Sequence, residues 1–277
     1  MLYTRYVKVK DLGIHEILHM HGMFERYYDH GPLDTFMRDL TKKDGVFLTH
    51  RKSDQSIVGF STLGIYYFDH EGKRVKGLFS GDTILEKEYW GSRSLQTAFA
   101  RKMFIEAIKR PFSQQYWLLI SKGYKTYLLL ARNFPVHYPD HQQERPSLKK
   151  LVINYCELLY PGHLDQERMV LTFGEEANAL KGEVAPITDS LRQSEPAIDF
   201  FAQRNPGWAD GHELPCVAQA DLLQQAGRLF LRAGAGFEQD HQPRDQMAQH
   251  PPGLGGGLLG GELELARGPA TLGQQRR

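Results

Sequence analysis

Cysteine is scarce in this chain: only Cys156 and Cys216 occur in 277 residues. Two thiols exclude a scaffold held together by disulfides, and they are compatible with a reducing compartment. Long apolar runs are also missing, because no stretch approaches the roughly 18 residues of a membrane-spanning helix. The N-terminal stretch MLYTRYVKVKDLG lacks the apolar segment of a signal peptide. These absences predict a cytoplasmic protein with no transmembrane segment.

An excess of either charge is absent too, since 34 Lys and Arg residues balance 33 Asp and Glu residues. A near-neutral chain has no general attraction to nucleic acid or to an acidic membrane surface. We therefore expect no nucleic-acid partner, whereas the expectation of a small-molecule substrate comes from the resemblance given below. The length allows one domain or two, and nothing in the sequence indicates an oligomeric state.

The first 140 residues predict an ordered series of alternating strands and helices. Asp11 can cap a first helix that runs to Tyr28 and carries Ile14, Ile17, Leu18 and Phe24 on its apolar face. Strands are predicted at Leu2–Val9, Val46–Arg51, Ile57–Phe68, Gly77–Leu85, Gln115–Ile120 and Phe134–Tyr138, and further helices at Leu33–Lys42, Ser92–Lys109 and Lys122–Arg132.

The stretch from Lys76 to Lys102 predicts a strand that leads through a short turn into a helix near Ser92. The first turn of a helix has amide groups without partners and carries partial positive charge, so it favours anions. Gly91, Ser92, Arg93 and Ser94 place a residue without Cβ, two hydroxyls and a cation there, which suits a phosphate or diphosphate. Alternatively, Ser92 only caps the helix.

Three segments resemble the GCN5-related N-acetyltransferase (GNAT) superfamily. IVGFSTL (Ile57–Leu63) is similar to its third strand, Phe79–Phe99 to its fourth strand, acyl-CoA diphosphate loop and next helix, and Leu118–Pro135 to its fifth strand and following helix. The resemblance covers residues 1–140. It implies an α/β fold with a GNAT-like mixed central sheet flanked by helices, and acyl-CoA or acetyl-CoA as co-substrate, with an acyl carrier protein as another donor and no metal.

The resemblance also implies site residues. Backbone groups of Ile84 and Leu85 would hold the pantetheine arm, and the remaining coenzyme contacts would come from Trp90, Gly91, Ser92, Arg93, Ser94 and Gln96. For transfer of an acyl group to a small amine or lipid-like acceptor, Asp82 is a candidate base, and Ser121 or Tyr127 a candidate acid. Other interpretations stay open: Asp82 at a strand bulge, Ser121 as a helix cap, and Tyr127 as a packing residue.

Two alternatives to acyl transfer remain. In the loop, only Gly91 keeps a glycine where the superfamily pattern has several, which favours a non-catalytic domain of the same fold that binds a ligand or partner. The stretch from His15 to His19 matches HExxH, so His15 and His19 could bind zinc with Glu16 as base. That zinc-dependent hydrolase is the more distant alternative, because Glu25 stands where a third histidine ligand would be.

Beyond residue 140, the pattern predicts a mainly helical extension packed on the first domain and ending at residue 232. Helices are expected at Ser147–Tyr160, Asp189–Gln203 and Asp221–Arg232, with a strand at Met169–Phe173. In the loop at 205–216, Trp208 and Glu213 could line a pocket, or Trp208 could anchor the loop. Residues 233–277 are rich in Gly, Gln, Pro and Arg, which predicts disorder.

Overall fold

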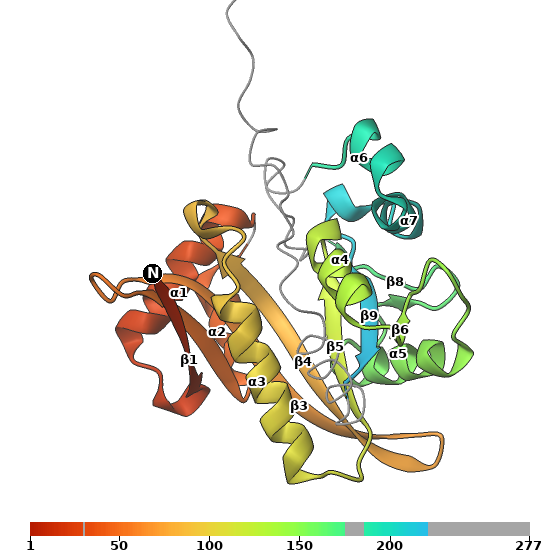
Figure 1. Cartoon of the computed structure of the whole chain (residues 1–277), viewed down its shortest axis with the longest axis horizontal. Coiled ribbons are helices and arrows are strands. Elements are labelled where there is room, and N and C mark those ends of the chain that lie inside the picture. The colour runs from red at the N-terminus through yellow and green to blue at the C-terminus, as the bar shows by residue number, and fades with distance from the viewer. Residues whose placement is uncertain (30, 175–185, 221–277) are drawn as a thin grey trace, which may run out of the picture. The chain divides into compact units, whose positions relative to one another are not determined.

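The computed structural model describes residues 1–29, 31–174 and 186–220 (Figure 1). All of them belong to one compact unit, Met1–Gly234, whereas the second unit, Ala235–Arg277, lies outside the described residues. The helix expected at 221–232 and the tail expected at 233–277 lie outside them as well. No helix among the described residues is both long and apolar enough to cross a membrane.

A seven-stranded mixed sheet forms the centre of the described unit, in the order β1-β2-β3-β4-β5-β9-β6. Neighbouring strands are antiparallel except β4 and β5, which are parallel. The strands are β1 (Leu2–Lys8), β2 (Gly45–Arg51), β3 (Ile57–His70), β4 (Lys73–Leu85), β5 (Gln115–Ser121), β6 (His137–Tyr138) and β9 (Leu214–Gln219), and a separate pair consists of β7 (Leu164–Asp165) and β8 (Val170–Leu171).

Helices cover both faces of this sheet. They are α1 (Ile14–Tyr27), α2 (Leu33–Thr41), α3 (Ser94–Lys109), α4 (Tyr124–Asn133), α5 (Pro146–Leu159), α6 (Asp189–Ser194) and α7 (Pro196–Arg204), with 3₁₀ turns at Val9–Asp11, Lys87–Tyr89 and Trp208–Asp210. Successive strand residues point to opposite faces. Phe47 accordingly packs with α3, α4 and α7, and its neighbours Val46 and Leu48 pack with α1 and α2.

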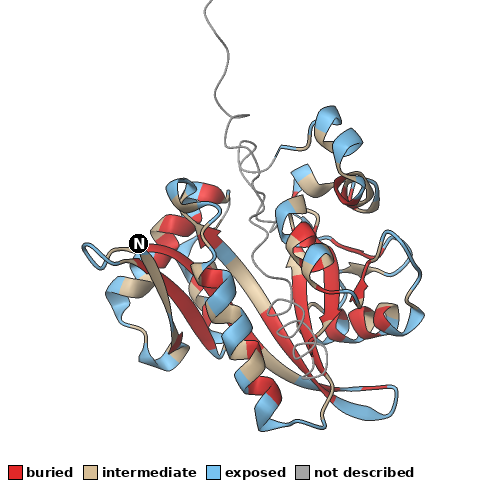
Figure 2. Ribbon diagram, viewed as in Figure 1, coloured by how far each residue is buried: buried red, intermediate tan, exposed pale blue. Residues whose placement is uncertain are grey.

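The second face carries two separate apolar clusters. One belongs to α1 and α2 and contains Phe60 and Ile84, and the other belongs to α5 and contains Phe79 and Leu118. Figure 2 shows the buried residues concentrated along the central strands. The part of this face between the two clusters carries polar residues and is described below.

The element order β1-α1-α2-β2-β3-β4-α3-β5-α4 and the single parallel pair make this a GNAT-like α/β fold, as the sequence predicted. The C-terminal extension is mainly helical, with α5, α6 and α7. It also supplies β9, which pairs with β5 in register from Tyr116↔Gln219 to Ser121↔Leu214. Strand β9 therefore joins this extension to the sheet formed by residues 1–140.

The apolar face predicted for α1 is partly wrong. Ile14 and Leu18 are 69% and 48% exposed, whereas the buried side is formed by Met20, Met23 and Tyr27 together with Phe24. The second half of α1 makes most of the contact with the sheet, so Ile14 and Leu18 face outward, whereas Ile17 packs against the edge of the α1–α2 cluster as predicted. The single helix expected at 189–203 is two helices, because Pro196 lacks an amide donor and begins α7.

Candidate functional site

Strands β4 and β5 part before β4 ends. Their ladder runs from Lys76↔Gln115 to Ser80↔Leu119, while β4 continues to Leu85 and the end of β5 pairs only with β9. One edge of residues 81–85 is therefore not covered by β5. We call this place the β4–β5 fork (residues 81–85 and 120–121), and the two strands diverge toward the top of Figure 1.

A bulge in β4 lies at the fork. The partners change from Leu63↔Ser80 to Ser61↔Thr83, so β4 uses one residue more than β3 over this interval. The interpretation of Asp82 as a bulge residue is therefore confirmed. A bulge bends the strand and re-aims the side chains that follow it.

The bulge decides which backbone groups face the fork. Before it, the Lys76 amide donates to the Gln114 carbonyl, so even-numbered residues face β5. After it, the Glu86 amide donates to Val58 of β3, so even-numbered residues face β3. Ile84 therefore bonds toward β3 and its side chain is buried against α1 and α2, which makes its predicted pantetheine contact wrong. Leu85 does face the fork, but its carbonyl accepts a hydrogen bond from Trp90 Nε1 at 2.7 Å.

The loop between β4 and α3 ends in an uncapped helix N-terminus. Gly91 has φ of +89°, a left-handed conformation that favours glycine, and a Cβ there would meet no atom within 4 Å. Helix α3 begins at Ser94 rather than Ser92, and Arg93 at the N-cap makes no side-chain capping bond. The Ser92 hydroxyl only accepts a long bond of 3.4 Å from the Ser94 amide. The loop thus retains the features of an anion site.

Neighbouring elements hold this loop in place. The Tyr27 hydroxyl donates to Glu86 Oε2 at 2.9 Å and accepts from the Lys87 amide at 3.1 Å. Arg51 donates to the Tyr89 hydroxyl at 3.0 Å. Ser94, predicted to contact coenzyme, instead bonds through its hydroxyl to Thr4 of β1 at 2.8 Å and so joins α3 to the sheet. Gln96 is exposed in the first turn of α3.

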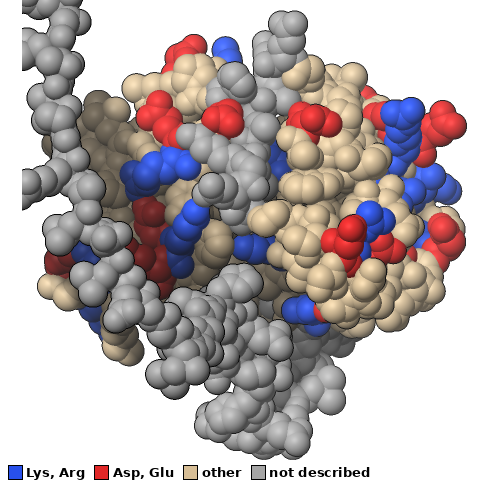
Figure 3. Space-filling model, turned by 90° about the horizontal axis from the view of Figure 1, so that it is seen from above, with Lys and Arg blue, Asp and Glu red and all other residues tan. Residues whose placement is uncertain are grey.

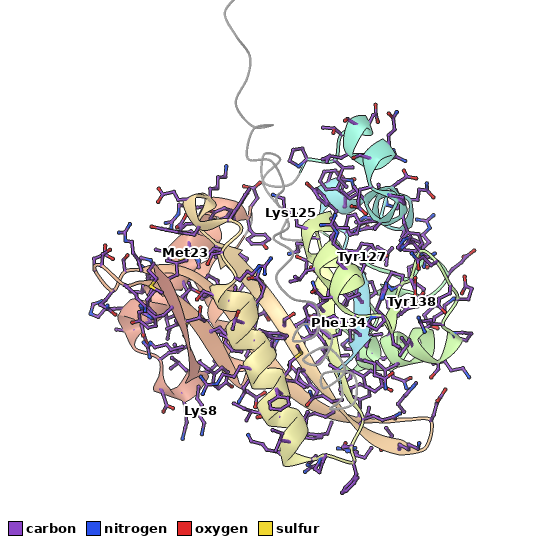
Figure 4. All side chains as sticks on the ribbon, in the orientation of Figure 1. Lys8, Met23, Lys125, Tyr127, Phe134 and Tyr138 are labelled. Carbon is purple, nitrogen blue, oxygen red and sulfur yellow. The ribbon has the colours of Figure 1, made fainter. Side chains whose placement is uncertain are left out.

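Positive side chains surround the loop. Lys125 of α4 places Nζ 3.9 Å from the ring centroid of Trp90, across the fork, and Trp90 is 43% exposed. Burial and then the charge of Lys87 lower the pKa of Lys125. Arg93 is exposed and makes no ion pair with any described residue. Figure 4 labels Lys125 at the fork end of α4, and Figure 3 shows Lys and Arg side chains interspersed with Asp and Glu side chains over the face seen from above.

A largely half-buried acid–base cluster includes Asp82 of the fork, and we name it the acceptor-side cluster. Its members come from six separate segments: Tyr28, Lys43, Asp82, Lys122, Tyr160 and Glu213. Lys122 Nζ lies 3.3 Å from Glu213 Oε1 and 5.1 Å from the ring centroid of Tyr28. Burial raises the pKa of both Asp82 and Glu213 above that of ordinary carboxyls, although Lys122 and Lys43 oppose the shift.

Lys43, Tyr28 and Tyr160 also stay in their uncharged forms more readily than usual. Burial lowers the pKa of Lys43, against the opposing charge of Asp82. Burial and the charges of Asp82 and Glu213 raise the pKa of Tyr28 and of Tyr160, so both hydroxyls keep their protons. Carboxyls and an amine shifted toward their neutral forms in one place are typical of sites that move protons.

The two predicted acids lie elsewhere. The Ser121 hydroxyl is buried and donates to the Gly123 carbonyl at 2.8 Å, and Gly123 rather than Ser121 is the N-cap of α4. Tyr127 is fully buried, stacks on Phe200 and donates to the Pro139 carbonyl at 3.2 Å. Both hydroxyls are committed to backbone acceptors, so neither reaches the cluster, and the packing interpretation of Tyr127 is the better one (Figure 4).

Replacing Tyr127 with Phe is expected to lower the free energy of unfolding by about 1 kcal/mol, because one buried hydrogen bond is lost. Any acyl-transfer rate should change by less than about twofold, since no proton passes through this hydroxyl. Urea unfolding and a rate assay on the same preparation measure both quantities. A large loss of rate with unchanged stability would instead show that Tyr127 takes part in catalysis.

Sequence reasoning found part of this site. Glu213 was a candidate pocket residue and belongs to the acceptor-side cluster. Trp208 instead packs against the apolar cluster that contains Phe47 and residues of α3, α4 and α7, and so anchors its loop. Tyr28, Lys43, Lys122 and Tyr160 were missed. The one available signal was Lys122, a charge that directly follows the apolar strand ending at Ser121.

The HExxH stretch serves structural roles. Glu16 accepts from the Gly13 amide at 2.9 Å and pairs with Arg5, and His19 Nε2 bonds the Ile57 carbonyl at 2.9 Å. His15 is exposed. Within residues 1–29, 31–174 and 186–220, no group of three His, Cys, Asp or Glu side chains is arranged to hold a metal ion. The residues of this motif therefore do not converge on a ligand site.

No protein-family model matches the chain, and no curated protein matches it. Among solved structures, it is similar to a conserved Enterococcus faecalis protein described as a probable N-acyltransferase, with 16% identity and a TM-score of 0.36 over 47% of this chain and 33% of that one. A Trypanosoma brucei acetyltransferase gives 16% identity and a TM-score of 0.34 over 52% and 97%.

A GNAT-family protein from Escherichia coli, solved with CoA, gives 9% identity and a TM-score of 0.32 over 44% of this chain and 64% of that one. The chain spans about a third of the Enterococcus protein. The strand order and the β4–β5 fork described above are what define the GNAT-like fold here.

Proposed function

We propose that this protein is a GNAT-type N-acyltransferase that moves an acyl group from acyl-CoA to an amine. The observation that carries the proposal is the β4–β5 fork, where β4 extends to Leu85 beyond its ladder with β5 and leads into an uncapped helix N-terminus. An uncovered strand edge can bind an extended pantetheine arm through backbone hydrogen bonds, as an added strand would.

The donor would be held in two places. Thr83 and Leu85 face the fork, so the backbone groups of Thr83 and the Leu85 amide could bond the pantetheine amides on that side, whereas the Leu85 carbonyl already accepts from Trp90 Nε1. Gly91, Ser92 and Arg93 surround the first amides of α3, where a diphosphate would be stabilised. A carrier protein's pantetheine could use the same strand edge, but it offers no diphosphate to the loop, so the loop favours CoA.

The chemistry follows from the acceptor-side cluster. The amine nitrogen attacks the thioester carbonyl carbon, and Asp82 accepts the proton that the amine loses. The tetrahedral intermediate then collapses with cleavage of the C–S bond, and the departing thiolate takes a proton. Asp82, which holds the proton taken from the amine and whose pKa is raised by burial, is the proposed donor of that proton. Holding the two substrates together supplies much of the rate by proximity.

Calorimetric titration of the full-length protein with acetyl-CoA and with a long-chain acyl-CoA tests the donor half of this proposal. Micromolar binding of either ligand is expected. If neither binds while circular dichroism shows a folded protein, the coenzyme assignment fails.

One observation favours a second candidate, a ligand- or partner-binding protein of the same fold without catalysis. The Leu85 carbonyl, one of the groups that a pantetheine arm would use, already accepts a hydrogen bond from Trp90 Nε1. In that case acyl-CoA would not bind, and Trp90→Phe would not restore binding. Restored binding in Trp90→Phe would instead show that the indole blocks a functional donor site.

A further inference from the structure

Thr62 on β3 lies at the bulge, and its hydroxyl is buried. The residue is 1% exposed, and its Oγ1 makes no hydrogen bond to any residue that the structure describes. A Cβ placed on Gly81 would lie 2.3 Å from this Oγ1, so the hydroxyl packs against Gly81 where any other residue would clash with it. A buried unpaired hydroxyl costs free energy, which suggests that a ligand satisfies it.

Lys43, which follows α2, supplies a second group at the same place. Its Cε lies 3.4 Å from the same Gly81 Cβ position, and its Nζ lies 4.8 Å from the ring centroid of Phe79. Lys43 makes no ion pair with any residue in the described part of the chain, although burial makes its charge expensive. A half-buried ammonium beside a buried hydroxyl presents two hydrogen-bond donors to one small anionic group.

The surrounding charges select the anion. Asp82 and Glu213 lie within electrostatic range of Lys43, and they would repel the double charge of a phosphate. A carboxylate carries one charge and has two oxygens for the two donors. Aromatic rings continue from this point: Phe79 contacts Tyr160, and Tyr160 contacts Phe173, with centroids 6.2 and 5.4 Å apart. Such rings suit an apolar side chain.

We propose that the acceptor is an α-amino acid with an apolar or aromatic side chain, whose carboxylate binds Lys43 and Thr62 while its amine faces Asp82. This inference rests on the proposed function, because the amine would receive the acyl group. An α-amino acid suits the arrangement because it carries one carboxylate and one amine on the same carbon, and Lys43 and Thr62 offer a donor pair beside Gly81, which directly precedes the base Asp82. The product would be an N-acyl amino acid.

The test compares three probes that differ at one group: L-phenylalanine, L-phenylalanine methyl ester and phenethylamine. Each is titrated calorimetrically into the full-length protein with no coenzyme present. The free acid is expected to bind at least about tenfold more tightly than the other two, because only it pairs a charge with Lys43. Equal affinity for acid and ester, or no binding of any probe, would overturn the proposal.

Two pairs of variants separate recognition from folding. Thr62→Val removes the hydroxyl at nearly constant shape. It should weaken the binding of L-phenylalanine severalfold and leave the affinity for the ester unchanged. It should not lower Tm, because the hydroxyl has no hydrogen-bond partner among the described residues. Thr62→Ser should retain the preference. Lys43→Met should abolish the preference for the acid, whereas Lys43→Arg should keep most of it. A lower Tm in Thr62→Val with the acid preference intact would contradict the assignment.

The donor titration keeps this inference separate from the proposed function. Acyl-CoA binding with no discrimination between acid and ester would refute the amino-acid acceptor and leave the acyltransferase in place. Tighter binding of the acid than of the ester, without any binding of acyl-CoA, would support the carboxylate site and refute the coenzyme assignment.

Discussion

Replacing Asp82 with Asn should lower kcat by about two to four orders of magnitude, the usual contribution of a positioned general base. Asparagine keeps the size of the side chain but cannot accept the proton of the amine. The variant should be at least as stable as the wild type at pH 7. Burial raises the pKa of folded Asp82, so the folded state binds this proton more tightly than the unfolded state does. Between the ordinary pKa of the unfolded carboxyl and the raised pKa of the folded one, the free energy of unfolding therefore falls as pH rises. An uncharged amide does not titrate, so the variant does not lose this stability.

The pH profile of kcat/KM provides the sharper check on Asp82. The wild-type rate should rise with pH through an apparent pKa above the usual range of a carboxyl, and the remaining activity of Asp82→Asn should lack that rise. Asp69→Asn is the matched control, since Asp69 lies at the exposed turn of the β3–β4 hairpin and pairs only loosely with Arg74 at 3.6 Å. An unchanged profile in Asp82→Asn would assign the base to another group, and Glu213→Gln would then be the variant to measure.

Reversing the charge of Arg93 should weaken acyl-CoA binding by about 10- to 100-fold, because a charge-assisted bond to the diphosphate becomes a repulsion. Arg93 is exposed at the N-cap of α3, and it makes no side-chain capping bond that the helix would lose. The Tm of Arg93→Glu should therefore stay close to that of the wild type. Calorimetric titration of acyl-CoA measures the affinity, and the difference between the two proteins should shrink as salt is added.

Arg101→Glu is the control for this variant, because Arg101 is an exposed residue of the same helix, away from its N-terminus. Equal losses in the two variants would indicate general attraction between a basic surface and an acidic ligand. A loss confined to Arg93→Glu would locate the diphosphate at the loop.

Local patterns were enough to predict most of the elements and the turn that leads from β4 into α3. Alternating residues gave the strands, and Gly91 with its hydroxyl and cationic neighbours marked the turn into α3. The position of Asp82 in a bulge also followed from Ser80-Gly81-Asp82-Thr83. What the sequence did not predict was the consequence of that bulge, namely that it turns the backbone of Ile84 toward β3 and that of Leu85 toward the fork.

The acceptor-side cluster could not be derived from local pattern at all. Lys43 follows a helix and Tyr160 ends another, and in isolation each is an ordinary boundary residue. Only the pairing of β9 with β5 brings Glu213 to Lys122, and β9 itself was hidden by Pro215 in a segment that has the composition of a loop. Contacts between distant segments are set by packing of the whole sheet, which no window of sequence contains.

Amine-dependent release of the CoA thiol is the measurement that tests the account most directly. Full-length protein is mixed with a long-chain acyl-CoA, with and without L-phenylalanine, and mass spectrometry follows the N-acyl product. We predict thiol release that requires the amino acid, matches the product one to one and is lost in Asp82→Asn. Bound acyl-CoA that is not consumed with any amine, in a folded protein, would contradict the account and leave a binding protein with a GNAT-like fold.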